Sequence, residues 1–205
     1  MRFPFLVIVT AIAPVLLAAA PPVALSPDLA QVQVHLRGVQ TMTADFTQTD
    51  RNGRTLTGTL QLKKPGKVRF QYQQGVPLLV VGDGNALTMI DYSVKQVSRW
   101  PIGSTPLALL LDPDKDIGRM ARTVPSGSPD EILVAGQDGK HREYGSITVA
   151  FRRQSGAPGG LLLEGWTVLD AQNNRTTVRL TNQKFNGAVA DSAFNWVDPR
   201  PHGPH

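Results

Sequence analysis

The chain has 205 residues, 41% of them hydrophobic and only 18% charged, with no cysteine and a formal net charge of +5. Its 19 Gly and 16 Pro favour one mainly β domain with many turns over long helices. The lack of cysteine excludes disulfides, thiolate metal sites and a lipid-modified N-terminal Cys.

The first twenty residues are typical of a signal peptide. Arg2 supplies the positive start, residues 3–17 form an apolar run, and residues 18–20 are small alanines suited to cleavage. The alternative is an uncleaved membrane anchor, for which this run is about the minimum length. We predict export with removal of residues 1–20.

The exported part is predicted to form a single domain over residues 21–197, followed by a Pro-rich, disordered tail over 198–205. The domain opens with a helix, because Ser26-Pro27-Asp28 combines a hydroxyl N-cap, a first-turn Pro and a first-turn acid. An apolar stripe then recurs at spacings of three and four residues, and this stripe needs a partner surface. The stripe consists of Leu29, Val32, Leu36 and Val39.

Alternation of apolar and polar residues then predicts a series of short strands. The first two are joined by Asn52-Gly53, a strong hairpin signal. Strands that follow one another in this way form an up-and-down meander, which gives a curved antiparallel sheet. The predicted strands cover residues 44–50, 55–63, 68–73, 77–81, 87–92, 96–100, 131–135, 147–151, 161–169 and 175–180.

The middle of the chain interrupts this sheet with helices. Ser104-Thr105-Pro106 predicts a second helix start, and residues 107–111 that follow are apolar without exception. Asp112-Pro113 ends that helix, and Asp114 is suited to capping a third short helix that carries Ile117 and Met120. A helical turn that is apolar all round must be covered on more than one side or receive a ligand.

One tight group of basic residues, Lys63, Lys64, Lys67 and Arg69, lies within this region of strands. Most of the group falls on the polar side of the alternation, and the nearby aromatic residues fall on the other side. We interpret it as a solvated strand face rather than the basic, aromatic-lined groove of a nucleic-acid binder.

Catalytic motifs are missing: the sequence holds no P-loop, nucleophile elbow or H-E-x-x-H. The spacing of Asp112, Asp114 and Asp116 resembles a calcium loop, but Ile117 stands where Gly is needed and Thr123 where the closing Glu is needed. Helix capping explains these acids more simply. We therefore predict no enzyme activity, no metal site and no cofactor.

What remains is a half-closed sheet with an apolar concave face and two apolar helices. Either the helices plug the sheet permanently, as an ordinary core, or they form a lid over a cavity. Large apolar cavities mark ligand sites. Sequence patterning does not separate the two alternatives.

Six stretches carry a family resemblance and follow one another in the family's order: residues 42–49, 58–66, 69–72, 79–84, 104–110 and 194–199. In these stretches the chain resembles the periplasmic outer-membrane lipoprotein carrier family (LolA-type). The resemblance implies an incomplete antiparallel β-barrel covered by a helical lid, with a hydrophobic cavity beneath the lid. It implies a monomeric carrier that takes lipid-modified proteins from an inner-membrane release complex, shields their acyl chains in the periplasm and passes them to an outer-membrane acceptor. No cofactor, reaction or nucleic acid is involved.

The resemblance also places the site. Family members commonly carry Arg before the Pro of the second strand, where it holds the lid closed; Lys64 stands there, as a point charge without the planar fork of Arg. The expected cavity lining is Phe46, Leu60, Leu62, Phe70, Tyr72, Met89 and Trp100, and the expected lid residues are Leu29, Val32, Leu36, Leu107, Leu110 and Leu111.

Other functions stay open from the sequence. A related binding module would carry another apolar ligand, such as a glycolipid. A structural or interaction domain would have a filled core and no cavity. A hydrolase would need a nucleophile and a base brought together, and no motif suggests such a pair.

Overall fold

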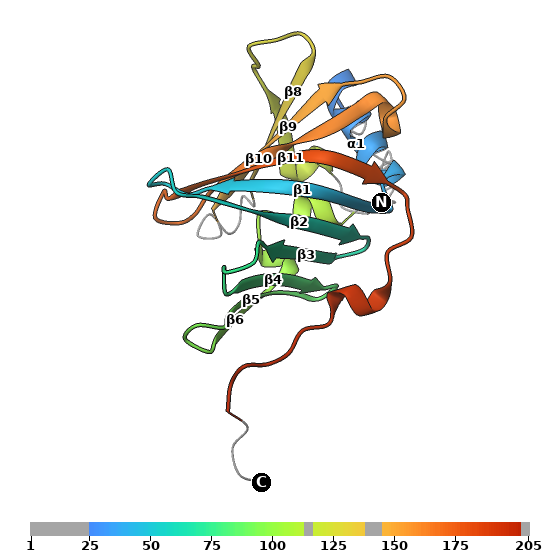
Figure 1. Ribbon diagram of the computed structural model, residues 1–205. Helices are drawn as coiled ribbons and strands as arrows, with labels where there is room; N and C mark the ends of the chain where they lie inside the picture. The colour runs from blue at the N-terminus through green and yellow to red at the C-terminus, as the bar shows by residue number, and fades with distance from the viewer. Residues whose placement is uncertain (1–24, 113–116, 138–144, 202–205) are drawn as a thin grey trace, which may run out of the picture.

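A single antiparallel sheet organises the molecule (Figure 1). The computed structural model describes residues 25–112, 117–137 and 145–201, so the predicted signal peptide and part of the tail lie outside it. The sheet has 11 strands in the order β6-β5-β4-β3-β2-β1-β11-β10-β9-β8-β7. It curves strongly and stays open between its edge strands β6 and β7, which confirms the predicted incomplete barrel.

Two meanders make up this sheet. The first runs from β1 to β6, the second from β7 to β11, and pairing of β1 with β11 joins them. Their bounds are β1 Thr41–Thr49, β2 Thr55–Lys63, β3 Lys67–Tyr72, β4 Leu78–Asp83, β5 Ala86–Asp91, β6 Gln96–Pro101, β7 Ala121–Val124, β8 Glu131–Gln137, β9 Ser146–Arg153, β10 Leu161–Leu169 and β11 Arg175–Phe185.

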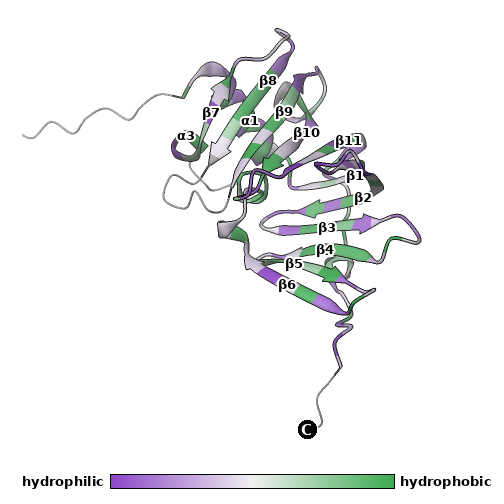
Figure 2. Ribbon diagram, turned by 90° about the vertical axis from the view of Figure 1, so that its left-hand side faces the viewer, coloured by the Kyte–Doolittle hydropathy of each residue, from purple (hydrophilic) through white to green (hydrophobic). Residues whose placement is uncertain are grey.

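The first helix forms where the apolar stripe predicted it. In α1, Pro27–Gly38, the Ser26 hydroxyl accepts a hydrogen bond from the Leu29 amide at 3.3 Å. All four residues of the predicted stripe are buried. The helix lies against β7, β10 and a short 3-10 turn, η3, Pro158–Gly160 (Figure 2).

The second helix starts differently from the prediction. Residues Ile102–Ser104 form their own 3-10 turn, η1, and the Thr105 hydroxyl donates to the Ile102 carbonyl at 2.8 Å. That hydroxyl is therefore engaged, and α2, Ala108–Leu111, begins without a side-chain cap. The third helix, α3, Ile117–Met120, follows close to its predicted place; Asp114 and Asp116 lie outside the described residues.

A buried histidine stabilises the packing of α1. The side chain of His35 is 2% exposed and lies edge-on to Phe151 and Phe185. Burial lowers the pKa of His35, so the ring is neutral at pH 7 and its Nδ1–H donates to the Pro158 carbonyl at 2.7 Å. His35 is therefore a core residue that links α1 to η3.

The C-terminal strap, which we define as residues 186–197, crosses the outer face of the first meander (Figure 1). It contains a 3-10 turn, η4, Asp191–Phe194. Phe194 packs on Leu79, Val81 and Ile90, which face away from the main core. The strap thus covers an apolar patch on β4 and β5.

The strap also corrects the interpretation of the basic group as a solvated face. Lys63 and Lys67 both contact Asp191, with N–O distances of 3.0 and 2.7 Å. Arg69 donates to the carbonyls of Ala193 and Asn195 at 3.2 and 2.9 Å. Three of the four basic residues therefore hold the strap, and only the return of the chain from far along the sequence brings their partners.

Candidate ligand cavity

The concave face of the sheet carries a cluster of aromatic rings. Register places Phe46 opposite Gly58, and Gly58 opposite Tyr72. The Phe46 ring lies edge-on to Phe70 and Tyr72, with centroids 5.4 and 5.2 Å apart, and Phe70 lies edge-on to Trp166 at 6.1 Å. Gly58 leaves the room that Phe46 occupies, since a Cβ there would lie 2.8 Å from the ring.

A small cavity remains between this face and α2. Its volume is about 10 Å³, roughly what one water molecule needs. Every lining residue is aliphatic or aromatic, and leucines of α2 and the residue before it fill most of the space. The lining consists of Met42, Leu60, Leu62, Val68, Phe70, Leu107, Leu110, Leu111, Leu163 and Trp166.

The structure brings six of the thirteen predicted lining and lid residues into this lining. The sheet residues Leu60, Leu62 and Phe70 and the α2 residues Leu107, Leu110 and Leu111 all face the cavity. Phe46 and Tyr72 are buried in the same core beside Phe70 without facing the cavity. Likewise the α1 residues Leu29, Val32 and Leu36 belong to that core but cover its β7–β10 side.

Two predicted lining residues lie elsewhere. Met89 pairs with Val80, and Trp100 with Leu87, so both occupy the concave face of β5 and β6. They are 38% and 44% exposed, because α2 does not extend over this edge. Met89 and Trp100 therefore lie beyond the closed cavity.

Sequence reasoning missed four lining residues. Met42 and Val68 follow the period-two pattern of their strands. Leu163 and Trp166 are three positions apart, so a regular strand would place them on opposite faces. Both nevertheless face the cavity. A register shift between Leu163 and Gly165 explains this, since a bulge adds one residue and turns the following side chains over.

The turn between β2 and β3 holds both helices. The ammonium of Lys64 donates to the Leu36 carbonyl in the last turn of α1. The Gly66 amide donates to the Leu111 carbonyl at the end of α2, at 3.0 Å. Burial lowers the pKa of Lys64 to about 8.

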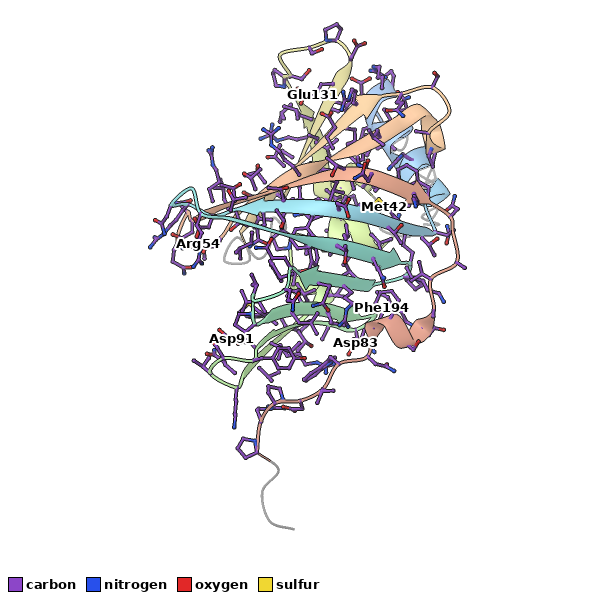
Figure 3. The ribbon with its side chains drawn as sticks, in the orientation of Figure 1. Met42, Arg54, Asp83, Asp91, Glu131 and Phe194 are labelled. Atoms are coloured by element: carbon purple, nitrogen blue, oxygen red, sulfur yellow. The ribbon has the colours of Figure 1, made fainter. Side chains whose placement is uncertain are left out.

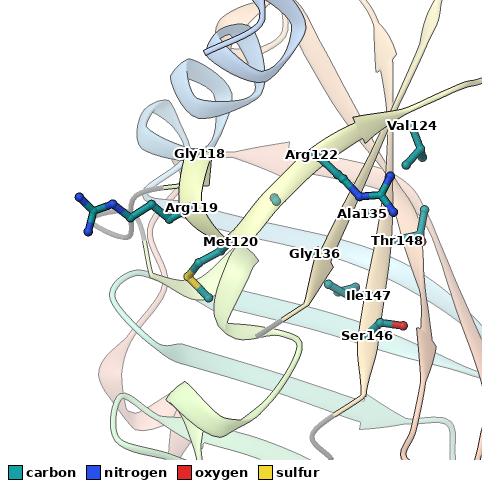
Figure 4. A pocket seen from close by; sticks show the side chains of 11 residues that line it. Gly118, Arg119, Met120, Arg122, Val124, Ala135, Gly136, Ser146, Ile147 and Thr148 are labelled. Atoms are coloured by element: carbon teal, nitrogen blue, oxygen red, sulfur yellow. The ribbon is translucent and has the colours of Figure 1, made fainter. Parts of the chain in front are cut away.

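A larger hollow lies at the other edge of the sheet, between α3 and strands β7 to β9 (Figure 4). Its volume is about 680 Å³ and its lining mixes Arg119, Arg122 and Ser146 with Met120 and Ile147. It is open and polar compared with the α2 cavity. We therefore take the α2 cavity as the candidate site.

An open, curved antiparallel sheet whose apolar concavity is filled by a helix defines an incomplete-barrel class of fold. The family model of outer membrane lipoprotein carrier protein LolA matches residues 37–197. The chain therefore belongs to the LolA family.

Curated relatives agree with this assignment. An outer-membrane lipoprotein carrier protein of Chromobacterium violaceum is 28% identical over 181 residues, 84% of each chain. One of Cupriavidus taiwanensis is 27% identical over 183 residues, 83% of each chain.

Solved structures give a weaker comparison. The LolA superfamily protein NE2245 of Nitrosomonas europaea has a TM-score of 0.47 at 10% identity, covering 82% of this chain and 96% of that one. The Pseudomonas aeruginosa MucA/MucB complex has a TM-score of 0.49 at 13% identity, covering 85% and 62%. The family assignment rests on the match over residues 37–197.

Proposed function

We propose that the protein is a periplasmic carrier that binds the acyl chains of lipoproteins on the concave face of its sheet. It would receive them from an inner-membrane release complex and deliver them to an outer-membrane acceptor, without catalysis or a cofactor. The observation that carries this proposal is the complete burial of the short helix α2 in the concave face of the sheet. Four consecutive residues of this helix, Ala108–Leu111, are buried, and they fill an apolar concavity that an acyl chain would also fit.

The exchange of α2 for an acyl chain replaces one set of apolar contacts on the sheet by another. Each methylene group removed from water contributes about 0.8 kcal/mol. When α2 moves out, its leucines keep most of that contribution only if they lie against the incoming chain. A ligand that contacts both the sheet and the displaced helix therefore opens the cavity, and its departure lets the leucines close it again.

Within this proposal the residues take distinct roles. The rings of Phe46, Phe70 and Tyr72, with Leu60 and Leu62, form the floor of the opened cavity. Met89 and Trp100 extend this floor toward the edge of the sheet. The leucines of α2 and the stripe of α1 form the lid, and Lys64 is the latch on the α1 carbonyl.

The decisive test uses spheroplasts that make lipoproteins. We expect the purified mature protein to release new lipoproteins into solution as a complex, as a known carrier does in parallel. No release beside a working known carrier rejects the proposal. Binding of a glycolipid without release of lipoproteins identifies a carrier for another apolar ligand.

Two variants connect release to the cavity. Leu110→Glu places a charge among the lining side chains and should abolish release, whereas Val34→Glu changes a side chain that is 59% exposed on α1 and should not. If Leu110→Glu unfolds the protein, Leu107→Glu gives the second test because Leu107 is only partly buried. Equal release by both cavity variants and the control contradicts the assignment of the site.

A further inference from the structure

A positively charged side chain stands at one end of the candidate cavity. Lys64 directly follows β2, and its amide donates to the Gln40 carbonyl at 2.8 Å, so the backbone pairing beside β1 continues to this residue. Because side chains alternate along a strand, Lys64 takes the same face as Leu62, which lines the cavity. The bond from its ammonium to the Leu36 carbonyl of α1 shows that the side chain points to the side that the helices cover.

The turn that contains Lys64 closes the same end of the cavity. The Gly66 amide donates to the Leu111 carbonyl at 3.0 Å, and Leu111 is a lining residue. At the start of β3, Val68 lies opposite Leu62, and both line the cavity. The ammonium of Lys64 therefore belongs to the turn at which the apolar lining ends.

This ammonium has no acidic partner within the described part of the chain. No carboxylate there forms an ion pair with Lys64. Burial alone lowers the pKa of Lys64 to about 8, so the group is mostly charged at neutral pH. A buried charge without a counter-ion is costly, and a neutral acceptor, the Leu36 carbonyl, stabilises this one.

The two sides of the turn differ in their charge balance. On the outer face Lys67 contacts Asp191 at 2.7 Å, and its ammonium lies 5.9 Å from the ring centroid of Phe194, which Figure 3 labels. On the inner side the other ionisable group near Lys64 is His35. Burial and the charge of Lys64 both lower the pKa of His35, which is therefore neutral. The positive charge is thus balanced outside and unbalanced inside, next to the cavity.

An apolar cavity with a single cation at its end fits a ligand that has an alkyl chain and one negatively charged end. The chain lies against the lining residues, and the charged end reaches the turn. A carboxylate accepts a charge-assisted hydrogen bond from an ammonium, which is stronger than the bond that a neutral carbonyl accepts. When α1 moves with the lid, the Leu36 carbonyl leaves Lys64 and the carboxylate takes its place.

We propose that Lys64 binds the carboxylate of a single-chain fatty acid whose alkyl chain occupies the α2 cavity. The ammonium exchanges the Leu36 carbonyl of the closed protein for a carboxylate oxygen of the ligand. This inference rests on the proposed opening of the cavity to acyl chains. It adds a preference for acyl ligands with a negatively charged end and assigns that preference to one side chain.

The test compares decanoate with decanol, which has the same number of carbon atoms and no charge. In isothermal titration calorimetry at neutral pH, the mature protein should bind decanoate at least about tenfold more tightly than decanol. Lys64→Met should abolish this preference, and Lys64→Arg should keep it. The ratio of the two affinities is the readout, because loss of the bond to Leu36 also loosens the lid and affects both ligands alike. Lys64→Gln keeps a donor for that carbonyl without the charge and should also abolish the preference.

Lys67→Met is the matched control, since it removes the same charge from the outer face of the same turn and should keep the ratio. Equal affinities of the unchanged protein for the two ligands, a preference that survives in Lys64→Met and Lys64→Gln, or an equal loss in Lys67→Met overturns the proposal. If both ligands bind without a preference, the carrier function stands and only this inference fails. If neither ligand binds, the cavity does not open to alkyl chains, and the proposed function fails together with the inference.

Discussion

The Lys64 ammonium donates a hydrogen bond to the Leu36 carbonyl, and this bond connects the sheet to the last turn of α1. A cation is favourable at this end of a helix, where the carbonyl dipoles point. The neighbouring Gly66 amide holds the Leu111 carbonyl of α2 in the same way, at 3.0 Å. Both helices over the concave face are therefore tied to one turn of the sheet.

Lys64 gives the folded state a pH dependence. Burial lowers its pKa from 10.5 to about 8, so between these values the unfolded chain binds more protons and the free energy of unfolding rises with pH. The stabilisation that the neutral Lys64 gives the folded state is complete above the unfolded pKa of 10.5. It is lost as the pH falls through about 8, the pKa of Lys64 in the folded protein. We expect a gain on the order of 2 kcal/mol from about pH 7 to about pH 10 in urea unfolding.

Lys64→Arg is the matched variant for this measurement. An arginine stays charged throughout the range and keeps a donor for the carbonyl, so the difference between the two proteins isolates the titration of Lys64. If the free energy of unfolding changes with pH in the same way in the unchanged protein and in Lys64→Arg, the Lys64 ammonium does not lose its proton in the folded protein.

The packing of Phe46 predicts a specific effect at Gly58. A Cβ at Gly58 would overlap the Gln71 carbonyl and lie 2.8 Å from the Phe46 ring. We expect Gly58→Ala to lower the free energy of unfolding by about 1–3 kcal/mol through overpacking. Gly127→Ala is the control, since no heavy atom lies within 4 Å of its Cβ position, and it should change stability by less than about 0.5 kcal/mol. Equal effects in thermal unfolding would disprove the close fit.

Local patterns in the sequence predicted most of the sheet and α1. The alternation from Thr55 to Lys63 and the three-and-four spacing from Leu29 to Val39 each describe one face of one element, and burial follows both. The strand β7 was not predicted, because its four residues, Ala121–Val124, show no clean alternation and are identified as a strand by their pairing with β8.

The parts of the site that sequence did not predict depend on contacts between distant segments. The bulge in β10 turns Trp166 toward the cavity. A strict alternation of faces along a strand does not predict where such an extra residue is inserted. The strap places Asp191 beside Lys63, more than a hundred residues away in sequence. The extent of α2 decides that Phe70 is covered while Trp100 is exposed.

Arg69 is expected to hold the strap against the sheet. Its guanidinium donates to the Ala193 and Asn195 carbonyls, at 3.2 and 2.9 Å. Arg69→Met keeps an apolar stem but loses both bonds, which we expect to cost about 1–3 kcal/mol. Hydrogen exchange in residues 189–197 should become faster, with the exchange of α1 unchanged.

Arg54→Met is the control for the strap. Arg54 lies at a hairpin tip, its side chain is 74% exposed, and its pair with Asp50 at 3.3 Å is a surface ion pair of small stabilising effect. If both variants leave exchange in the strap unchanged, the two carbonyl bonds do not hold it.

The last prediction separates a lid from a plug. Leu110 lines the small cavity and is 4% exposed, so Leu110→Ala should lower the free energy of unfolding by about 2–5 kcal/mol. If α2 is a lid, the closed state competes with the ligand, and destabilising that state should raise the affinity for a fluorescent fatty acid. If α2 is a plug, stability falls and no fatty acid binds.

Leu161→Ala provides the comparison that this argument needs. Leu161 is fully buried in the same core but does not line the cavity, so its loss destabilises the fold without favouring displacement of α2. A gain in fatty-acid affinity in Leu110→Ala alone supports the lid. The same gain in both variants would mean that the fatty acid binds a loosened core, and the assignment of α2 as the mobile element would then be wrong.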